Sequence, residues 1–101
     1  MWMGHVYLKT YATDKGTMVA CCDEELMGKT FREGRLRLSL ESGFYGNMLF
    51  ALGEALVHLD KADILNLVGR VVIDAAIERG IVHPEAVIFI AGIPHVQVMR
   101  L

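Results

Sequence analysis

The sequence has little cysteine and little proline, with two residues of each among 101. Cys21 and Cys22 are adjacent, and because neighbouring side chains of an extended segment point to opposite faces, they are poorly placed to form a disulfide. Two thiols without a second Cys/His cluster match no zinc pattern. We therefore expect one thiol to be buried, the other to lie near the surface, and no metal or cofactor to be bound.

An excess of positive charge is also absent, since the formal net charge is −2. This excludes a protein that coats duplex nucleic acid through a global basic field, so any RNA contact must come from a local patch. The longest stretches without Asp, Glu, Lys or Arg, 42–53 and 86–99, are shorter than the ~18–20 apolar residues of a membrane-spanning helix. No basic segment followed by a long apolar run begins the chain, so we expect a cytoplasmic protein without a signal peptide.

Apolar residues are in surplus. Hydrophobic residues make up 53% of the chain and ten further residues are glycine, whereas an ordinary soluble domain has about 45–50% with glycine counted. A chain this short cannot bury so much apolar surface within itself. The surplus predicts a homodimer or a contact with another protein.

Alternating apolar residues predict strands at 6–11 and 17–22, joined by a turn at 14–16, then a third strand at 35–40 and two C-terminal strands at 87–90 and 96–99. Asp23 is expected to cap a short helical turn over 24–27. Helical spacing predicts helices at 47–58 and at 61–79, the second being one long central helix. We expect a single compact α+β domain over residues 1–101, with a mostly antiparallel sheet covered on one face by the helices.

A basic cluster is the first candidate site. Lys29, Arg32, Arg35 and Arg37 lie within nine residues, and Arg35 and Arg37 should project from one face of a strand, about 6.6–7 Å apart, near the spacing of phosphates.

Three aromatic residues near this cluster can stack on bases, namely Phe31, Phe44 and Tyr45. The alternative is a solvated strand face whose cations pair with acidic neighbours, namely Glu24, Glu25 or Glu41.

The second candidate is a stripe at helical spacing, Asn66, Arg70, Asp74 and Glu78. An i,i+4 ion pair with Asp74 would hold Arg70, and Asn66 and Arg70 would then contact a ligand. The alternative is the solvent face of the helix.

His95, in a loop over 91–95, is the third candidate. Pro94 suits a tight turn, cis or trans, that fixes the direction of His95 as an acid, base or ligand. A structural histidine is the alternative, because no Ser, Cys or Asp partner stands at a recognisable spacing. The absence of known catalytic motifs disfavours an enzyme.

Three segments together resemble a family of small archaeal proteins, domain of unknown function 424. They are residues 22–34 (CDEELMGKTFREG), 66–69 (NLVG) and 92–97 (GIPHVQ), and the likeness covers nearly the whole chain. The resemblance implies an archaeal cytoplasmic protein with a link to translation, and it assigns no activity. The positions that carry the resemblance are the ones at which we expect a site shared by the family. They are Asp23, Gly28, Lys29, Asn66, Gly69, Pro94 and His95.

Three functions remain open. The first is a non-enzymatic binding module for RNA or a ribosome-associated complex, acting through Lys29, Arg32, Arg35 and Arg37. The second is a homo-oligomeric protein–protein interaction subunit. The third is a small enzyme or ligand binder with a pocket formed by Asn66, Arg70 and His95.

Overall fold

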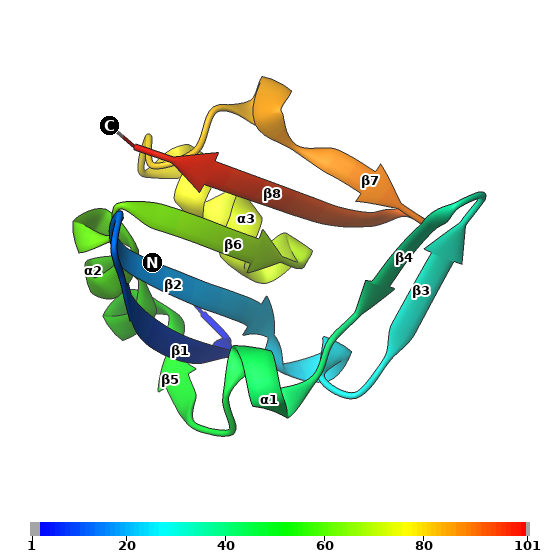
Figure 1. The fold of residues 1–101 in the computed structure, drawn as a ribbon, viewed down its shortest axis with the longest axis horizontal. Helices are drawn as coiled ribbons and strands as arrows, with labels where there is room; N and C mark the ends of the chain where they lie inside the picture. Colours follow the sequence, from blue (N-terminus) through cyan, green and yellow to red (C-terminus); the bar gives the residue numbers. More distant parts are fainter. Residues whose placement is uncertain (1–2, 101) are drawn as a thin grey trace.

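The computed structural model describes residues 3–100 as a mixed α+β fold (Figure 1). The strands are β1 (His5–Thr13), β2 (Gly16–Asp23), β3 (Thr30–Glu33), β4 (Leu36–Ser39), β5 (Leu49–Ala51), β6 (Ile64–Val68), β7 (Ile88–Ile90) and β8 (Ile93–Met99). The helices are α1 (Ser42–Tyr45), α2 (Leu52–Lys61) and α3 (Arg70–Glu78), with 3₁₀ turns η1 (Glu24–Leu26) and η2 (Pro84–Ala86).

Six strands form one sheet in the order β5-β1-β2-β6-β8-β7. Only β2 and β6 pair in parallel; the other neighbours in this sheet are antiparallel. The predicted α+β class, the mostly antiparallel sheet and the N-terminal hairpin are thereby confirmed. The third predicted strand, 35–40, was assigned to the wrong sheet, because β4 pairs with β3 in a separate two-stranded sheet.

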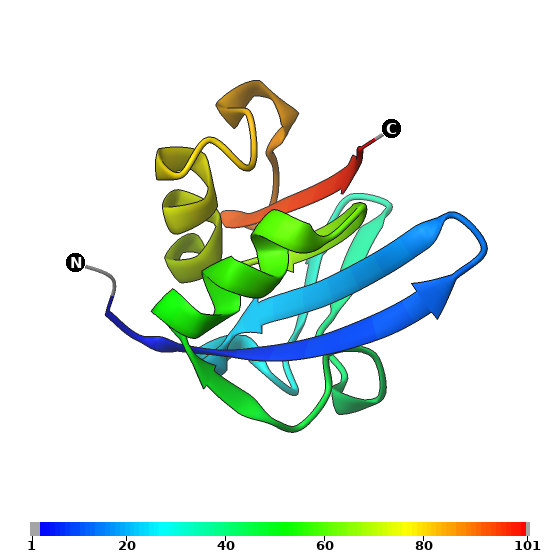
Figure 2. The same ribbon diagram turned by 90° about the vertical axis from the view of Figure 1, so that its left-hand side faces the viewer.

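Both faces of the large sheet are covered in part. Helices α2 and α3 lie together on one face (Figure 2), where their side chains pack on residues such as Leu65 and Leu67. On the other face, Cys22 packs in a second cluster with residues of β4 and α1. Cys21 and Cys22 are therefore both fully buried, and the prediction of one thiol near the surface is wrong.

The predicted helices 47–58 and 61–79 need correction. Residues Leu49–Ala51 form β5, and α2 begins only at Leu52. The long central helix does not exist: Ile64–Val68 form β6 between two neighbouring strands, and α3 is nine residues long. Gly69, with a φ of +113°, separates the strand from the helix. Within residues 3–100, no helix has the length and apolar character needed to cross a bilayer.

Candidate functional site

The β3–β4 hairpin carries the four cations that the sequence singles out. Its turn is formed by Gly34 and Arg35, and Gly34 has a φ of +58°, as the first central position of a type II′ turn requires. Arg32 and Arg37 face each other across the two strands. Lys29 directly precedes β3, and all four cationic side chains are exposed. We call Lys29, Arg32, Arg35 and Arg37 the basic hairpin.

This geometry differs from the predicted one in the position of Arg35. The sequence places Arg35 and Arg37 on one face of one strand, but Arg35 lies in the turn. Arg32, on the neighbouring strand, stands opposite Arg37 instead. The register of β3 against β4 therefore creates a cross-strand pair of cations, and strand periodicity alone could not reveal it.

No ion pair neutralises the basic hairpin within the described part of the chain. The predicted pairing with Glu24, Glu25 or Glu41 is thus not observed there. The Oε1 atom of Glu33 accepts a hydrogen bond of 2.7 Å from the backbone N–H of Ala91, which fastens the hairpin to the β7–β8 turn. Like charges directly opposite each other destabilise a strand pair. A bound anion would therefore relieve the repulsion between Arg32 and Arg37 and stabilise the hairpin.

The inner side of the hairpin is apolar. Phe31 faces Leu38 across the strands, and Leu38 is buried in the second cluster. Tyr45 is buried in the same cluster, while Phe44 is half-buried and stacks on Tyr11 with ring centroids 5.7 Å apart. The prediction that Phe31, Phe44 and Tyr45 stack on bases is wrong for Tyr45, and the other two rings pack against the same core.

The structure separates the three residues of the predicted ligand pocket, Asn66, Arg70 and His95. Asn66 lies in β6 and accepts a hydrogen bond of 2.9 Å from the hydroxyl of Tyr45 at its Oδ1 atom. Arg70 begins α3 and donates from Nη2 to the carbonyl of Gly92 at 3.0 Å. His95 lies in β8, with Nδ1 3.0 Å from a carbonyl oxygen of β6. Asn66 lines one cavity and Arg70 lines two others, and His95 lines none of these three.

The predicted helical stripe is correspondingly wrong. Arg70, Asp74 and Glu78 do lie on α3, but Asn66 belongs to a strand. Arg70 and Asp74 form no ion pair among residues 3–100.

The predicted loop before His95 is also wrong. Pro94 is the second residue of β8 and stands opposite Phe89 of β7. The two-residue turn is Ala91-Gly92, with φ values of +52° and +80°. No cis peptide bond occurs between residues 3 and 100. Pro94 is tolerated in this strand position because the ladder with β6 ends at His95, so no β6 residue stands opposite position 94 to need its N–H.

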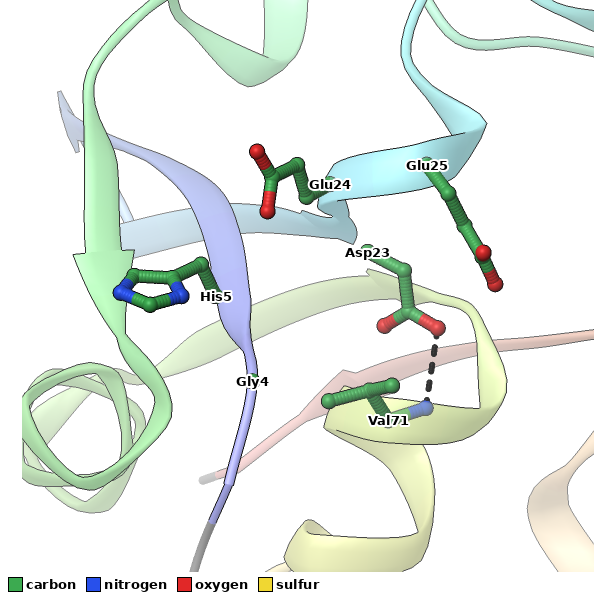
Figure 3. A pocket seen from close by; sticks show the side chains of 6 residues that line it. All are labelled: Gly4, His5, Asp23, Glu24, Glu25 and Val71. Carbon is green, nitrogen blue, oxygen red and sulfur yellow. Dashed lines mark hydrogen bonds between the residues drawn. The ribbon is translucent and has the colours of Figure 1, made fainter.

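Asp23 is the polar residue whose role the sequence did not reveal. It was expected to cap the turn that follows it, but it makes no side-chain bond there. Its carboxylate instead accepts hydrogen bonds from the backbone N–H groups of Val71, at 2.9 Å (Figure 3), and of Val72, at 3.0 Å. These donors belong to the first turn of α3, whose preceding residue, Gly69, has no side chain to cap it.

Asp23 also lines a pocket of about 420 Å³ with His5, Glu24, Glu25 and Val71 (Figure 3). Asp23 is 2% exposed, and this burial raises the pKa of its carboxyl group, against the opposing effect of the two backbone hydrogen bonds. Both of its oxygens are used to hold α3. Its role in the structure is to join the end of β2 to the beginning of that helix.

A crystal structure described as that of an uncharacterized conserved protein from Methanopyrus kandleri has a similar fold. The TM-score is 0.75 at 20% sequence identity, and the match covers 97% of this chain and 95% of that one. No curated protein matches the sequence. The model of the family described as "Protein of unknown function (DUF424)" matches residues 10–101, and the chain belongs to this family.

Proposed function

We propose that this chain is a non-enzymatic binding module that holds the phosphate backbone of RNA with the basic hairpin, in a complex associated with translation. The observation that supports this most directly is the pair Arg32 and Arg37. Two exposed guanidinium groups stand opposite each other on adjacent strands. Arginine is suited to this task, because its planar donor fork matches the oxygens of a phosphate.

The hairpin is also firmly held and open on its outer side. Its inner side is anchored by Phe31 and Leu38, and Glu33 is bound to the β7–β8 turn. It lies at one side of the molecule, away from α2 (Figure 1). Because the hairpin backbone is held in this way, it needs no reordering when the arginines bind an anion.

The test is RNA binding by a charge-reversed hairpin. The wild-type protein should bind a labelled single-stranded RNA of mixed sequence with a salt slope of about −2.8, the value expected for four cations. Arg32→Glu with Arg37→Glu should abolish most of this binding. Fluorescence anisotropy at several salt concentrations measures both quantities.

The matched control is Lys15→Glu with Lys61→Glu. Both lysines are exposed; Lys15 lies in the β1–β2 turn and Lys61 at the end of α2. The two substitutions change the net charge by the same amount as those in the hairpin. The control should bind nearly as the wild type does. Equal weakening of the two variants, or wild-type binding that does not depend on salt, would contradict the proposal.

Association with translation is tested separately. The tagged wild-type protein should sediment with ribosomal particles in an archaeal extract at low salt, and should leave them at high salt or after ribonuclease treatment. The hairpin variant should remain at the top of the gradient under every condition. Co-sedimentation of the hairpin variant would show that another surface makes the contact.

A second candidate function is a homodimer, favoured by the apolar edge strand β7. Ile88 and Phe89 are successive residues, so they point to opposite faces, yet each is about half exposed, at 50% and 54%. An uncovered edge strand can pair with the same strand of a second copy about a twofold axis. Light scattering at micromolar concentration should then show a dimer that Phe89→Lys dissociates, and a monomeric wild type would exclude this candidate.

A further inference from the structure

A second pocket opens on the face of the large sheet that α2 and α3 do not cover. It has a volume of about 300 Å³ and lies over β2, β6 and β8. The β3–β4 hairpin and α1 bury only the neighbouring part of this face, around Cys22 and Val68. The pocket is lined chiefly by Met18, Ile64, Asn66, Gln97 and Met99.

Two carboxamide groups line this pocket, those of Asn66 and Gln97. Asn66 and Gln97 are direct partners across the antiparallel β6–β8 pair, so their Cβ atoms lie about 5 Å apart on one face. The hydroxyl of Tyr45 is bound to Oδ1 of Asn66, which fixes the orientation of that amide. Within residues 3–100, neither the Nδ2 donors of Asn66 nor any side-chain atom of Gln97 forms a hydrogen bond.

The rest of the pocket is apolar. Met18 and Ile64 are half-buried, and Met99 is 51% exposed. Apolar walls around a few convergent polar groups are typical of sites that bind small molecules. Methionine sulfur makes favourable contacts with aromatic rings, and carboxamides recognise base edges through paired hydrogen bonds.

We propose that the Asn66–Gln97 pocket holds an unstacked nucleobase with a ring carbonyl, uracil or guanine, from the RNA strand whose phosphates the basic hairpin binds. This inference rests on the proposed function. Tyr45 occupies an acceptor position of Asn66, so Asn66 chiefly offers donors, which select a carbonyl oxygen. Gln97 supplies both a donor and an acceptor, and the acceptor can receive the ring N–H beside that carbonyl.

The test compares oligouridylate and oligoadenylate, each of eight nucleotides and of equal charge. Their affinity ratio is measured for the wild type, Gln97→Met and Asn66→Asp. Methionine removes the hydrogen bonds of Gln97 with little change of shape, and aspartate keeps the acceptor for Tyr45 while removing the donors. Each variant should lower the preference for uridylate by roughly tenfold, the value of one good hydrogen bond.

Arg37→Gln, which removes only one cation from the hairpin, serves as the control and should weaken the binding of both oligonucleotides equally, leaving the ratio unchanged. Salt-dependent binding with a ratio that neither pocket variant alters would overturn the pocket and leave the proposed function standing.

If neither oligonucleotide binds, the proposed function fails, and uridine alone then tests the pocket. At millimolar uridine, the side-chain amide NMR signals of Asn66 and Gln97 should shift in the wild type. An absence of shifts would overturn the inference. Gln97 is exposed, so Gln97→Met keeps the test usable should Asn66→Asp fail to fold, which thermal unfolding would reveal.

Discussion

The carboxylate of Asp23 occupies the space in which a side chain at Gly69 would lie. A Cβ atom built on Gly69 would overlap the carbon and both oxygens of that carboxylate, and the φ of +113° at Gly69 also disfavours any other residue. Asp23 can therefore hold Val71 and Val72 only because position 69 is glycine. The end of β2 and the beginning of α3 are fastened by this pair.

Gly69→Ala should lower the free energy of unfolding by about 2–4 kcal/mol, from the cost of the left-handed backbone and from displaced hydrogen bonds of Asp23. Urea-induced unfolding measures this. Gly28→Ala is the matched control, because Gly28 has a φ of +86° and no atom near its missing Cβ. The control should show only the backbone cost, about 1–2 kcal/mol. Equal losses in both variants would mean that Asp23 does not depend on Gly69.

The stability of the protein should depend on the pH through Asp23. Burial raises the pKa of this carboxyl group in the folded state. The raised pKa therefore adds to the free energy of unfolding. This stabilisation is fully present below the pKa of the unfolded chain, about 3.9, and is lost as the pH rises through the pKa of the folded state. Urea unfolding of the wild type and Asp23→Asn from pH 3.5 to 7 isolates this residue. The difference, wild type minus variant, should fall as the pH rises; a difference that grows would contradict the raised pKa.

The sequence revealed the elements that rest on local signals. Alternation with a glycine-containing turn predicted the β1–β2 hairpin, and short apolar runs predicted the C-terminal strands. It failed where an element is buried on both faces. The residues of β6 show no alternation, since Leu65, Leu67 and Val68 are all fully buried, and such a run cannot be distinguished from a helix by its periodicity.

The site was predictable in composition but not in geometry. Four cations close together in the sequence marked the hairpin, but the pairing of Arg32 with Arg37 depends on a strand register that the sequence does not state. The contact of Asp23 with α3 joins residues far apart in the chain. Capping rules describe the helix that follows a residue, so they assigned Asp23 to the wrong helix.

Ala91 offers a site for stabilisation. Its φ of +52° is unfavourable for alanine, and it precedes Gly92, with a φ of +80°, in a two-residue hairpin turn. Asn-Gly is the preferred pair for two successive residues of positive φ. Ala91→Asn should raise the free energy of unfolding by about 1 kcal/mol, or Tm by about 4–8 °C. Thermal unfolding measures the shift, and an unchanged or lower Tm would show that the turn is not strained.

The two thiols should be unreactive in the folded protein. Burial raises the pKa of Cys22 to about 12 and that of Cys21 well above its ordinary value, and only the thiolate is nucleophilic. At pH 8, a thiol-specific disulfide reagent should modify neither residue in buffer and both in 8 M urea. Rapid reaction of one thiol in buffer would show that one face of the sheet opens on the time scale of the assay.

Replacing Arg37 of the facing pair Arg32 and Arg37 should stabilise the fold and weaken RNA binding. Arg37→Glu replaces a like-charged cross-strand pair with an opposite pair beside Arg32, so the free energy of unfolding should rise by about 0.2–1 kcal/mol. Arg37→Gln, which only removes the repulsion, should gain less. The same changes should weaken RNA binding, glutamate more than glutamine, and reduce the salt slope by at least about 0.7. Urea unfolding and anisotropy on the same samples test both effects. If the two arginines bind RNA, the substitutions should raise the free energy of unfolding and lower the affinity for RNA. A gain in stability without a loss of affinity would therefore show that the pair is only a solvated strand face.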